Sequence, residues 1–172
     1  MKQIYIPWRQ MEKMTTRIGI DILRGDWRPS FIVGINRGGL TPAVMLSHLL
    51  NVPLYTLRVS LRDGVEDDCD HNLWMSERAY GYGQTGCLED LPENILIVDD
   101  INDSGATFEW IQKDWRSSCL PNSSEWDKVW HNNVKFAVLV NNLASNQTAD
   151  FSAMEINKAE EPSWVTFPWE YE

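Results

Sequence analysis

The stretch that most constrains the fold lies at residues 95–107 and reads ILIVDDINDSGAT. Its four consecutive apolar residues are typical of a strand that is buried on both faces of a parallel sheet. Two aspartates follow at the carboxyl end of that strand, and a turn around Gly105 then leads into a helical pattern. A helix N-terminus offers free N–H groups to a phosphate, and a glycine there lets the backbone approach the anion closely. The stretch therefore predicts an α/β fold with a phosphate site at one edge of its sheet.

Strand and helix patterns alternate along the rest of the chain. Short runs of apolar and β-branched residues predict further strands at residues 31–35, 54–60, 135–140 and 151–156. Helical patterns occur at residues 8–25, 42–52, 107–117 and 126–130. This alternation is typical of a single α/β domain, here residues 1–172, with a mostly parallel sheet flanked by helices. We expect its core at about residues 26–145 and a small base-binding hood from the C-terminal segment, at about residues 150–172.

Residues 61–94 show no helical or strand period and are rich in glycine and acidic residues. Five of the eight residues at positions 63–70 are acidic, which is typical of a solvated loop. Loops of this length inside a compact domain are usually functional or mobile. We therefore expect a mobile loop here, with a hinge and aromatic cover at Tyr80, Gly81, Tyr82 and Gly83.

The charge balance limits the possible partners. The formal net charge is -10 and the pI is about 4.7, so the field of the whole molecule repels nucleic acids and anionic membrane surfaces. Backbone N–H groups, arginines and a metal ion still allow a phosphorylated small molecule to bind. The three cysteines form no C-x-x-C pair, and we find no export signal and no apolar run long enough to cross a membrane. We expect a cytoplasmic protein with no nucleic-acid partner and no membrane segment.

The stretch at residues 95–107 resembles the motif with which type I phosphoribosyltransferases bind phosphoribosyl pyrophosphate (PRPP), two acidic residues followed by D-(T/S)-G-(G/A)-T. The resemblance implies that Asp99 and Asp100 hold the ribose hydroxyls, directly or through Mg²⁺. It also implies a turn that binds the 5′-phosphate, formed by Asp103, Ser104, Gly105, Ala106 and Thr107. Asp103 would in addition lie near N7 of a purine and act as general base. Taken alone, an aspartate pair after a strand also occurs in other phosphate-binding proteins, and Asp103 also suits a helix N-cap.

A second match precedes the first by two strand–helix units, where FIVGINRGG at residues 31–39 resembles the pyrophosphate-binding loop of the same family. The residues that would bind the leaving group, through N–H donors and one guanidinium, are Asn36, Arg37, Gly38 and Gly39. An R-G-G sequence after a strand is by itself often just a turn, but its order relative to residues 95–107 strengthens the resemblance. Thr41 and Pro42 are then expected as the N-cap and first residue of the following helix.

A third match lies in the tail, where SWVTFPWE at residues 163–170 resembles the base-binding segment W-I-x-x-P-W-D of bacterial xanthine-guanine phosphoribosyltransferases. This resemblance implies that Trp164 stacks on a purine and that the backbone of Val165 reads its edge. Glu170, in the same segment, is a further candidate ligand for Mg²⁺. The alternative is that Trp164 and Trp169 are core or interface residues.

One position departs from the family. Members that use 6-oxopurines carry a lysine at the end of the strand that corresponds to residues 135–140, whereas this chain has Asn141 and Asn142 there. The amide of Asn142 can still donate a hydrogen bond to a base. The departure leaves the choice among xanthine, guanine and hypoxanthine open, and it makes adenine or another base possible.

Together, the three matches imply a Mg²⁺-dependent enzyme of purine salvage that joins a nucleobase to the ribose of PRPP and releases pyrophosphate. Two alternatives remain open. One is a non-catalytic regulator that senses a nucleotide with the same fold, and the other is a phosphoribosyltransferase for a different base. The resemblance and the nine tryptophans also suggest a homodimer or homotetramer.

Overall fold

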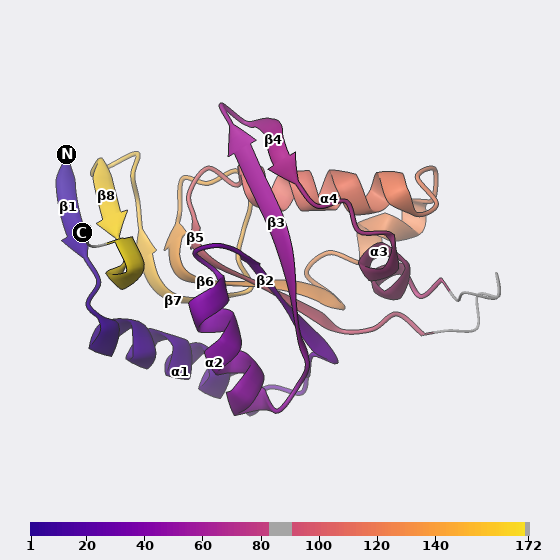
Figure 1. The fold of residues 1–172 in the computed structure, drawn as a ribbon, viewed down its shortest axis with the longest axis horizontal. Helices are drawn as coiled ribbons and strands as arrows, with labels where there is room; N and C mark the ends of the chain where they lie inside the picture. Colours follow the sequence, from indigo (N-terminus) through magenta and orange to yellow (C-terminus); the bar gives the residue numbers. More distant parts are fainter. Residues whose placement is uncertain (83–90, 171–172) are drawn as a thin grey trace.

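The computed structural model of the chain describes residues 1–82 and 91–170 (Figure 1). Its helices are α1 (Trp8–Arg24), α2 (Leu40–Leu50), α3 (Leu73–Tyr80) and α4 (Ala106–Ser118). Its strands are β1 (Lys2–Tyr5), β2 (Phe31–Asn36), β3 (Leu54–Arg62), β4 (Val65–Cys69), β5 (Ile95–Asn102), β6 (Val134–Asn142), β7 (Phe151–Ile156) and β8 (Ser163–Thr166). Two 3₁₀ turns lie at Ser124–Lys128 and Pro168–Glu170, and the first of them replaces the short helix expected at residues 126–130.

Six strands form the central sheet in the order β4-β3-β2-β5-β6-β7. Every neighbouring pair is parallel except β3 and β4, which form an antiparallel hairpin. Helices α1 and α2 pack on one face of the sheet, and α3 and α4 cover the other (Figure 1). The apolar runs of β5 and β6 are buried at the centre because helices cover both faces. The prediction of an α/β fold with a mostly parallel sheet is confirmed.

Helix α1 shows how an apolar stripe places an element on the sheet. Met11, Met14, Ile18 and Ile22 recur at helical spacing, and all four are buried. Gly25, the last residue of the helical pattern predicted at residues 8–25, is the C-cap of the helix. Through this stripe α1 packs against α2 and β7.

Helix α2 begins earlier than the sequence predicts. Its N-cap is Gly39, and the N–H of Ala43 donates to the Gly39 carbonyl oxygen at 3.0 Å. Thr41 and Pro42 therefore lie inside the first turn, and the prediction of Thr41 as N-cap is wrong. The helix starts where the chain passes β5 so closely that a Cβ on Gly39 would stand 2.4 Å from the carbonyl oxygen of Val98.

The acidic segment at residues 63–70 is exposed to solvent as predicted but is not a loop, because most of it forms β4 and pairs with β3. Two arginines of β3 each pair with one of its five acidic residues. Arg58 pairs with Asp68 at 2.8 Å, and Arg62 pairs with Asp67 at 3.6 Å. The loop prediction is wrong here because the compensating charges come from the neighbouring strand.

Helix α3 is a second element within the expected loop. Asn72 caps its start, and Gly81, with a φ of 85°, ends it. Tyr80 packs its ring on Trp126, with ring centroids 5.3 Å apart, and so belongs to the core. Residues 83–90 of the expected mobile loop, Gly83 among them, lie outside the described residues.

A second, two-stranded sheet joins the two ends of the chain. β1 and β8 run parallel, with Gln3 opposite Trp164 and Ile4 opposite Val165. Val165 and Phe167 are buried in the part of the core that α1 and α2 cover. The sequence predicted the C-terminal hood but not β1, whose four residues are mostly exposed and too few to show a period.

Several tryptophans of the second half belong to the core beneath α4. Trp115 and Trp126 are fully buried, and the ring of Trp130 lies 5.9 Å and 5.8 Å from theirs. The Nε1–H of Trp126 donates to the carbonyl oxygen of Cys119 at 2.7 Å. These three side chains are therefore core residues.

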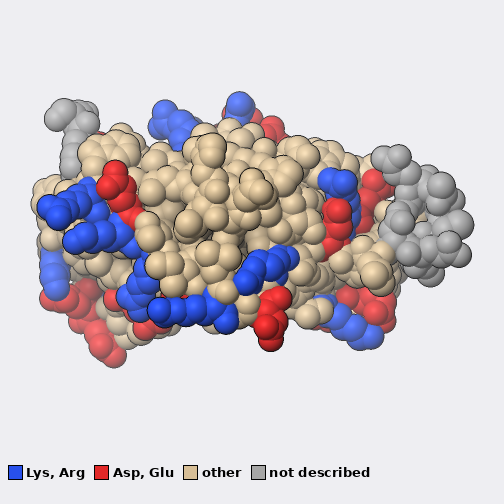
Figure 2. All heavy atoms as spheres, turned by 90° about the horizontal axis from the view of Figure 1, so that it is seen from below, with Lys and Arg blue, Asp and Glu red and all other residues tan. Residues whose placement is uncertain are grey.

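The surface over α1 carries basic side chains in spite of the net negative charge. Figure 2 views this side and shows Lys and Arg gathered toward the left, where α1 lies, beside a broad uncharged area in the middle. The basic residues of α1 are Arg9, Lys13, Arg17 and Arg24. In the part of the chain that the structure describes, no helix is both long and apolar enough to cross a membrane.

Candidate active site

Asp99 and Asp100 follow the buried apolar run of β5 at the carboxyl edge of the sheet. Oδ1 of Asp99 accepts from the N–H of Asp100 at 2.9 Å, and Oδ1 of Asp100 accepts from the N–H of Ile101 at 2.8 Å. Burial, together with the charge of Asp100, raises the pKa of Asp99 well above its usual range, and burial raises the pKa of Asp100 to about 6. Such an acid pair suits a cation or a ligand that carries hydroxyl groups.

An Asp100→Asn variant is expected to be more stable than the wild type at pH 8. The folded-state pKa of about 6 exceeds the ordinary 3.8, so the folded protein binds this proton more tightly than the unfolded chain does. The resulting stability is full below about pH 4 and is lost as the pH rises through about 6. The variant lacks this loss, so its melting temperature should exceed that of the wild type by roughly 2–8 °C at pH 8, and by less at pH 4. Calorimetric melting without added metal measures this, and a lower melting temperature for the variant at pH 8 would contradict it.

The phosphate turn, residues 103–107, joins β5 to α4. Gly105 is the N-cap of α4 and has a φ of 91°, a conformation that favours glycine. Oγ of Ser104 accepts from the N–H of Ala106 at 3.3 Å. Residues 99–108 line a pocket of about 230 Å³, the phosphate pocket. Because the helix N-terminus opens into this pocket, the turn is suited to an anion.

The pyrophosphate loop, residues 36–39, lies at the same edge of the sheet, at the end of β2 beside β5. The pyrophosphate pocket, of about 620 Å³, is lined by Arg37, Gly38, Leu40, Thr41, Asp100, Trp169 and Glu170. A Cβ on Gly38 would stand 1.9 Å from Oδ2 of Asp100, so any larger residue here would displace the Asp100 carboxyl group. Gly39 packs on the backbone of β5, and Oδ1 of Asn36 is buried without a hydrogen-bond partner in the described part of the chain. The peptide bond between Asn36 and Arg37 is cis.

The third pocket, the base pocket, has a volume of about 140 Å³. It is lined by Asp100, Ile101, Asp103, Lys158, Trp164, Val165, Phe167 and Glu170. Trp164 is 55% exposed, which leaves its ring accessible to a ligand. The rings of Phe167 and Trp169 stack with planes 2° apart, and Oε2 of Glu170 accepts from the N–H of Phe167 at 2.7 Å. Both contacts lie within the tail and fix the turn that follows β8.

The three pockets adjoin one another. Asp100 lines all three, Asp103 lines the phosphate and base pockets, and Glu170 lines the pyrophosphate and base pockets. The structure thus brings the three sequence motifs together, although they are far apart in the chain. The site can hold a phosphate, a pyrophosphate and a flat base around one pair of carboxyl groups.

Asn142 lies behind the base pocket and does not line it. Its Nδ2–H donates to the carbonyl oxygen of Asp103 at 2.9 Å. Its Oδ1 accepts from the N–H groups of Ala144 and Lys158, at 3.2 Å and 3.1 Å. Asn142 therefore holds the phosphate turn and the segment after β7, and its direct contact with a base stays a prediction.

Three residues of the base pocket were not singled out from the sequence: Ile101, Lys158 and Phe167. Nζ of Lys158 lies 2.9 Å from Oδ1 of Asp103. A signal was present, because Lys158 follows a predicted strand, and the carboxyl ends of parallel strands meet at one edge of the sheet. Without the order of the strands in the sheet, this position was not enough to predict that Lys158 lines the site.

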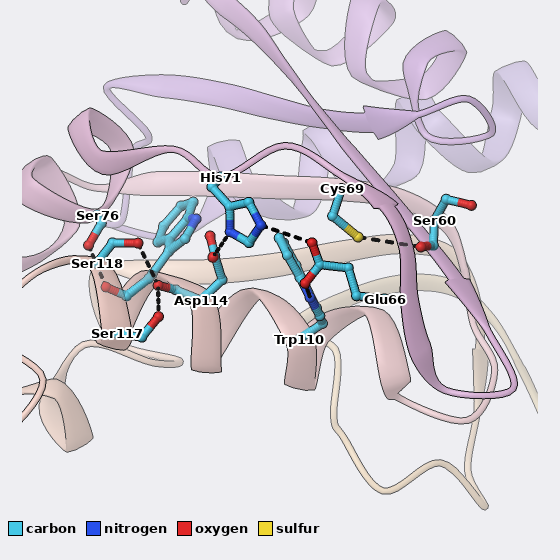
Figure 3. A network of polar contacts seen from close by, with 10 residues as sticks. Ser60, Glu66, Cys69, His71, Ser76, Trp110, Asp114, Ser117 and Ser118 are labelled. Carbon is cyan, nitrogen blue, oxygen red and sulfur yellow. Dashed lines mark hydrogen bonds and ion pairs between the residues drawn. The ribbon is translucent and has the colours of Figure 1, made fainter.

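A polar network ties the hairpin of β3 and β4 to α4 (Figure 3). His71 contacts Asp114 of α4 through Nδ1 and Glu66 of β4 through Nε2, the latter at 2.8 Å. Glu66 also accepts from Nε1–H of Trp110 at 3.2 Å. Asp114, through a hydrogen bond and its charge, and then Glu66 raise the pKa of His71. The network holds the hairpin against the helix whose N-terminus forms the phosphate turn.

Known proteins resemble this chain over nearly its full length. The family model for the phosphoribosyl transferase domain matches residues 3–172. A hypoxanthine-guanine phosphoribosyltransferase of Schizosaccharomyces pombe is 21% identical over 98% of this chain and 89% of its own, and a xanthine-guanine phosphoribosyltransferase of Nitratidesulfovibrio vulgaris is 23% identical over 97% and 84%. The crystal structure of a purine phosphoribosyltransferase from Pyrococcus horikoshii shares the fold, with a TM-score of 0.69 and 24% identity over 100% of this chain and 97% of that one. The chain therefore belongs to the phosphoribosyl transferase domain family.

Proposed function

We propose that this protein transfers the 5-phosphoribosyl group of PRPP to a purine base and produces a nucleoside monophosphate and pyrophosphate, as in purine salvage. One observation carries the proposal. Three adjoining pockets that suit a phosphate, a pyrophosphate and a flat base share Asp100. The names of the relatives, hypoxanthine-guanine and xanthine-guanine phosphoribosyltransferases, support a purine as the acceptor.

Each pocket contributes one part of this reaction. The N–H groups of the phosphate turn bind the 5′-phosphate and fix the position of the ribose. Arg37 stabilises the charge that builds on the departing pyrophosphate. Asp99 and Asp100 face the ribose, which becomes electron-poor in an oxocarbenium-like transition state. Asp103 accepts the proton of the base while a ring nitrogen of the base attacks the anomeric carbon of the ribose.

Mg²⁺ is the cofactor that we propose, with Asp99 and Asp100 as ligands and Glu170 as a further candidate. Buried neighbouring carboxyl groups with raised pKa values fit a divalent cation, which offsets their mutual repulsion. Within residues 1–82 and 91–170, no three His, Cys, Asp or Glu side chains form a ready-made metal cluster, so substrate oxygens would complete the coordination. When bound, the ion supplies charge neutralisation at the pyrophosphate.

Pyrophosphate release is the direct test. The protein is incubated with PRPP, Mg²⁺ and, in separate reactions, adenine, guanine, hypoxanthine, xanthine and the pyrimidine bases. Release with a purine supports the proposal. Binding of PRPP in calorimetry without release from any base would instead support the non-catalytic regulator, and release with a pyrimidine alone would support a different acceptor.

A Trp164→Ala variant is expected to raise KM for the base about 5–150-fold, because stacking on an aromatic ring is worth about 1–3 kcal/mol. The ring is 55% exposed, so its removal leaves no cavity in the core. Steady-state kinetics at saturating PRPP measures the effect. Trp164→Phe keeps an aromatic face and should retain most of the affinity. An unchanged KM in the alanine variant would favour the alternative of an interface residue.

We also propose that the protein is a homodimer or homotetramer. Four apolar side chains on α1 and α2, each 40–43% exposed, support this proposal: Ile20, Leu23, Val44 and Leu49. The two helices pack against each other, and Figure 2 shows the uncharged area on their side of the molecule. Apolar surface of this kind is typical of subunit interfaces. Sedimentation equilibrium at micromolar concentration is the test, and a monomer would contradict the proposal.

A further inference from the structure

Lys158 is held at the carboxyl edge of the sheet, two residues after the end of β7. Its N–H donates to Oδ1 of Asn142 at 3.1 Å, and the N–H of Leu143 donates to the carbonyl oxygen of Ile156 at 2.8 Å. These bonds fasten the segment after β7 to the end of β6. Because Asn142 also binds the backbone of Asp103, the same amide fixes Lys158 beside the phosphate turn.

The side chain of Lys158 enters the base pocket. Its Nζ lies 2.9 Å from Oδ1 of Asp103, and the side chain is only 20% exposed, whereas lysine side chains are usually exposed. Of the described residues that line this pocket, Lys158 is the one with a basic side chain. An ammonium group has three donors and no acceptor. One donor meets Asp103, which leaves donors for a ligand.

We infer that Lys158 donates a hydrogen bond to the 6-oxo group of the bound base, so that 6-oxopurines are used in preference to adenine. This rests on the proposed function, in which Asp103 accepts the proton of the base, and on the family resemblance, which implies that Asp103 lies near N7 of a purine. N7 and the C6 substituent lie on the same edge of a purine, and the C2 substituent lies on another. A base whose N7 faces Asp103 therefore presents its C6 substituent to Nζ of Lys158.

The chemistry of that substituent decides the preference. Guanine, hypoxanthine and xanthine carry an oxygen at C6, which accepts a hydrogen bond from an ammonium group. Adenine carries an amino group there, which is a donor, and Lys158 has no acceptor to meet it. Two donors placed against each other leave both groups without a partner, which disfavours adenine.

The inference also explains the departure at the end of β6. This chain has Asn141 and Asn142 where oxopurine-using members of the family carry a lysine. The structure places a lysine at the same edge from the next strand, with Asn142 as its backbone anchor. The missing charge is thus supplied by Lys158 after β7.

The test compares hypoxanthine with adenine in the wild type and in a Lys158→Met variant, which removes the charge but keeps a long side chain. The wild type should have the higher kcat/KM for hypoxanthine. In the variant, kcat/KM for hypoxanthine should fall about 10–150-fold, mainly through KM, which is the range for a hydrogen bond to a charged group. The kcat/KM for adenine should fall far less. Any disturbance of Asp103 affects both bases alike, so the ratio of the two values isolates the contact at C6. Lys158→Arg keeps the charge and should keep the preference for hypoxanthine.

Lys113→Met is the matched control, because Lys113 is 73% exposed on α4 and pairs with Glu109. In this control, the ratio of kcat/KM for hypoxanthine to kcat/KM for adenine should equal that of the wild type. A wild type that prefers adenine, or an unchanged ratio in Lys158→Met, overturns the inference. If no base is turned over, the proposed function fails, and the inference is then decided by the calorimetric Kd values of inosine and adenosine monophosphates. If Lys158→Met changes the Kd of both nucleotides equally, the inference is overturned. If the variant loses affinity for inosine monophosphate selectively, the inference is supported.

Discussion

An Asp103→Asn variant is expected to bind PRPP almost as the wild type does but to turn over about 10²–10⁴ times more slowly, the range for a general acid–base group. Asp103 lines both the phosphate pocket and the base pocket. Asparagine has the same shape, and the backbone carbonyl that accepts from Asn142 at 2.9 Å is unchanged. The phosphate turn therefore stays in place, while the neutral amide takes up a proton far less readily than a carboxylate does. Pyrophosphate release gives kcat, and calorimetry gives the Kd of PRPP.

Asp127→Asn serves as the control for this experiment, because Asp127 lies in the 3₁₀ turn Ser124–Lys128 and its side chain is 72% exposed. Its partner is Arg116 of α4. The control variant should change neither kcat nor Kd. The lost ion pair between Asp103 and Lys158 should cost little stability, since the Asp103 side chain is 51% exposed. Turnover equal to the wild type would exclude Asp103 as general base. A loss in PRPP affinity as large as the loss in kcat would assign it to phosphate binding instead.

A Gly39→Ala variant is expected to lose about 1–3 kcal/mol of stability and about 10²-fold in turnover. The added Cβ would stand 2.4 Å from the carbonyl oxygen of Val98, 2.8 Å from Cα of Asp99 and 2.9 Å from the carbonyl oxygen of Ile35. All three are backbone atoms, so no side-chain rotation relieves the contact. The pyrophosphate loop has to move away from β5, and this separates Arg37 from the acid pair. Melting temperature and pyrophosphate release measure the two effects.

Gly25→Ala is the matched control. A Cβ on Gly25 finds only the carbonyl oxygen of Ile22, at an ordinary 3.8 Å. This variant should melt and turn over PRPP as the wild type does. A Gly39→Ala protein with the stability and activity of the Gly25→Ala protein would refute the close packing of the loop on β5.

Local patterns were enough to predict most elements of the central sheet. Four apolar residues before Asp99 predict a buried central strand, and the structure buries all four. Residues 151–156 were predicted as a strand and form β7. These predictions succeed because the burial of a strand, or of one face of a helix, depends on residues within one element.

The same local reasoning failed where the deciding partner is distant in the chain. The sequence of β4 alone predicts a loop because it is acidic. Its ion pairs with Arg58 and Arg62 become evident only in the structure. The strand β1 has too few apolar residues to be recognised, and it forms because β8 supplies its hydrogen bonds. In both elements the stabilising groups come from another segment, so the period of the element itself carries no signal.

The sequence by itself determined the fold class and the residue types of the phosphate turn, the pyrophosphate loop and the hood. Each of these three segments is a short run of residues whose chemistry can be inferred from the run alone. Only the tertiary structure decided that Lys158 shares a pocket with Asp103. That contact depends on β7 lying beside β6 and on Asn142 binding both backbones. The order of strands in a sheet follows from the packing of the whole core, and it sets which carboxyl ends, and hence which side chains, lie in contact.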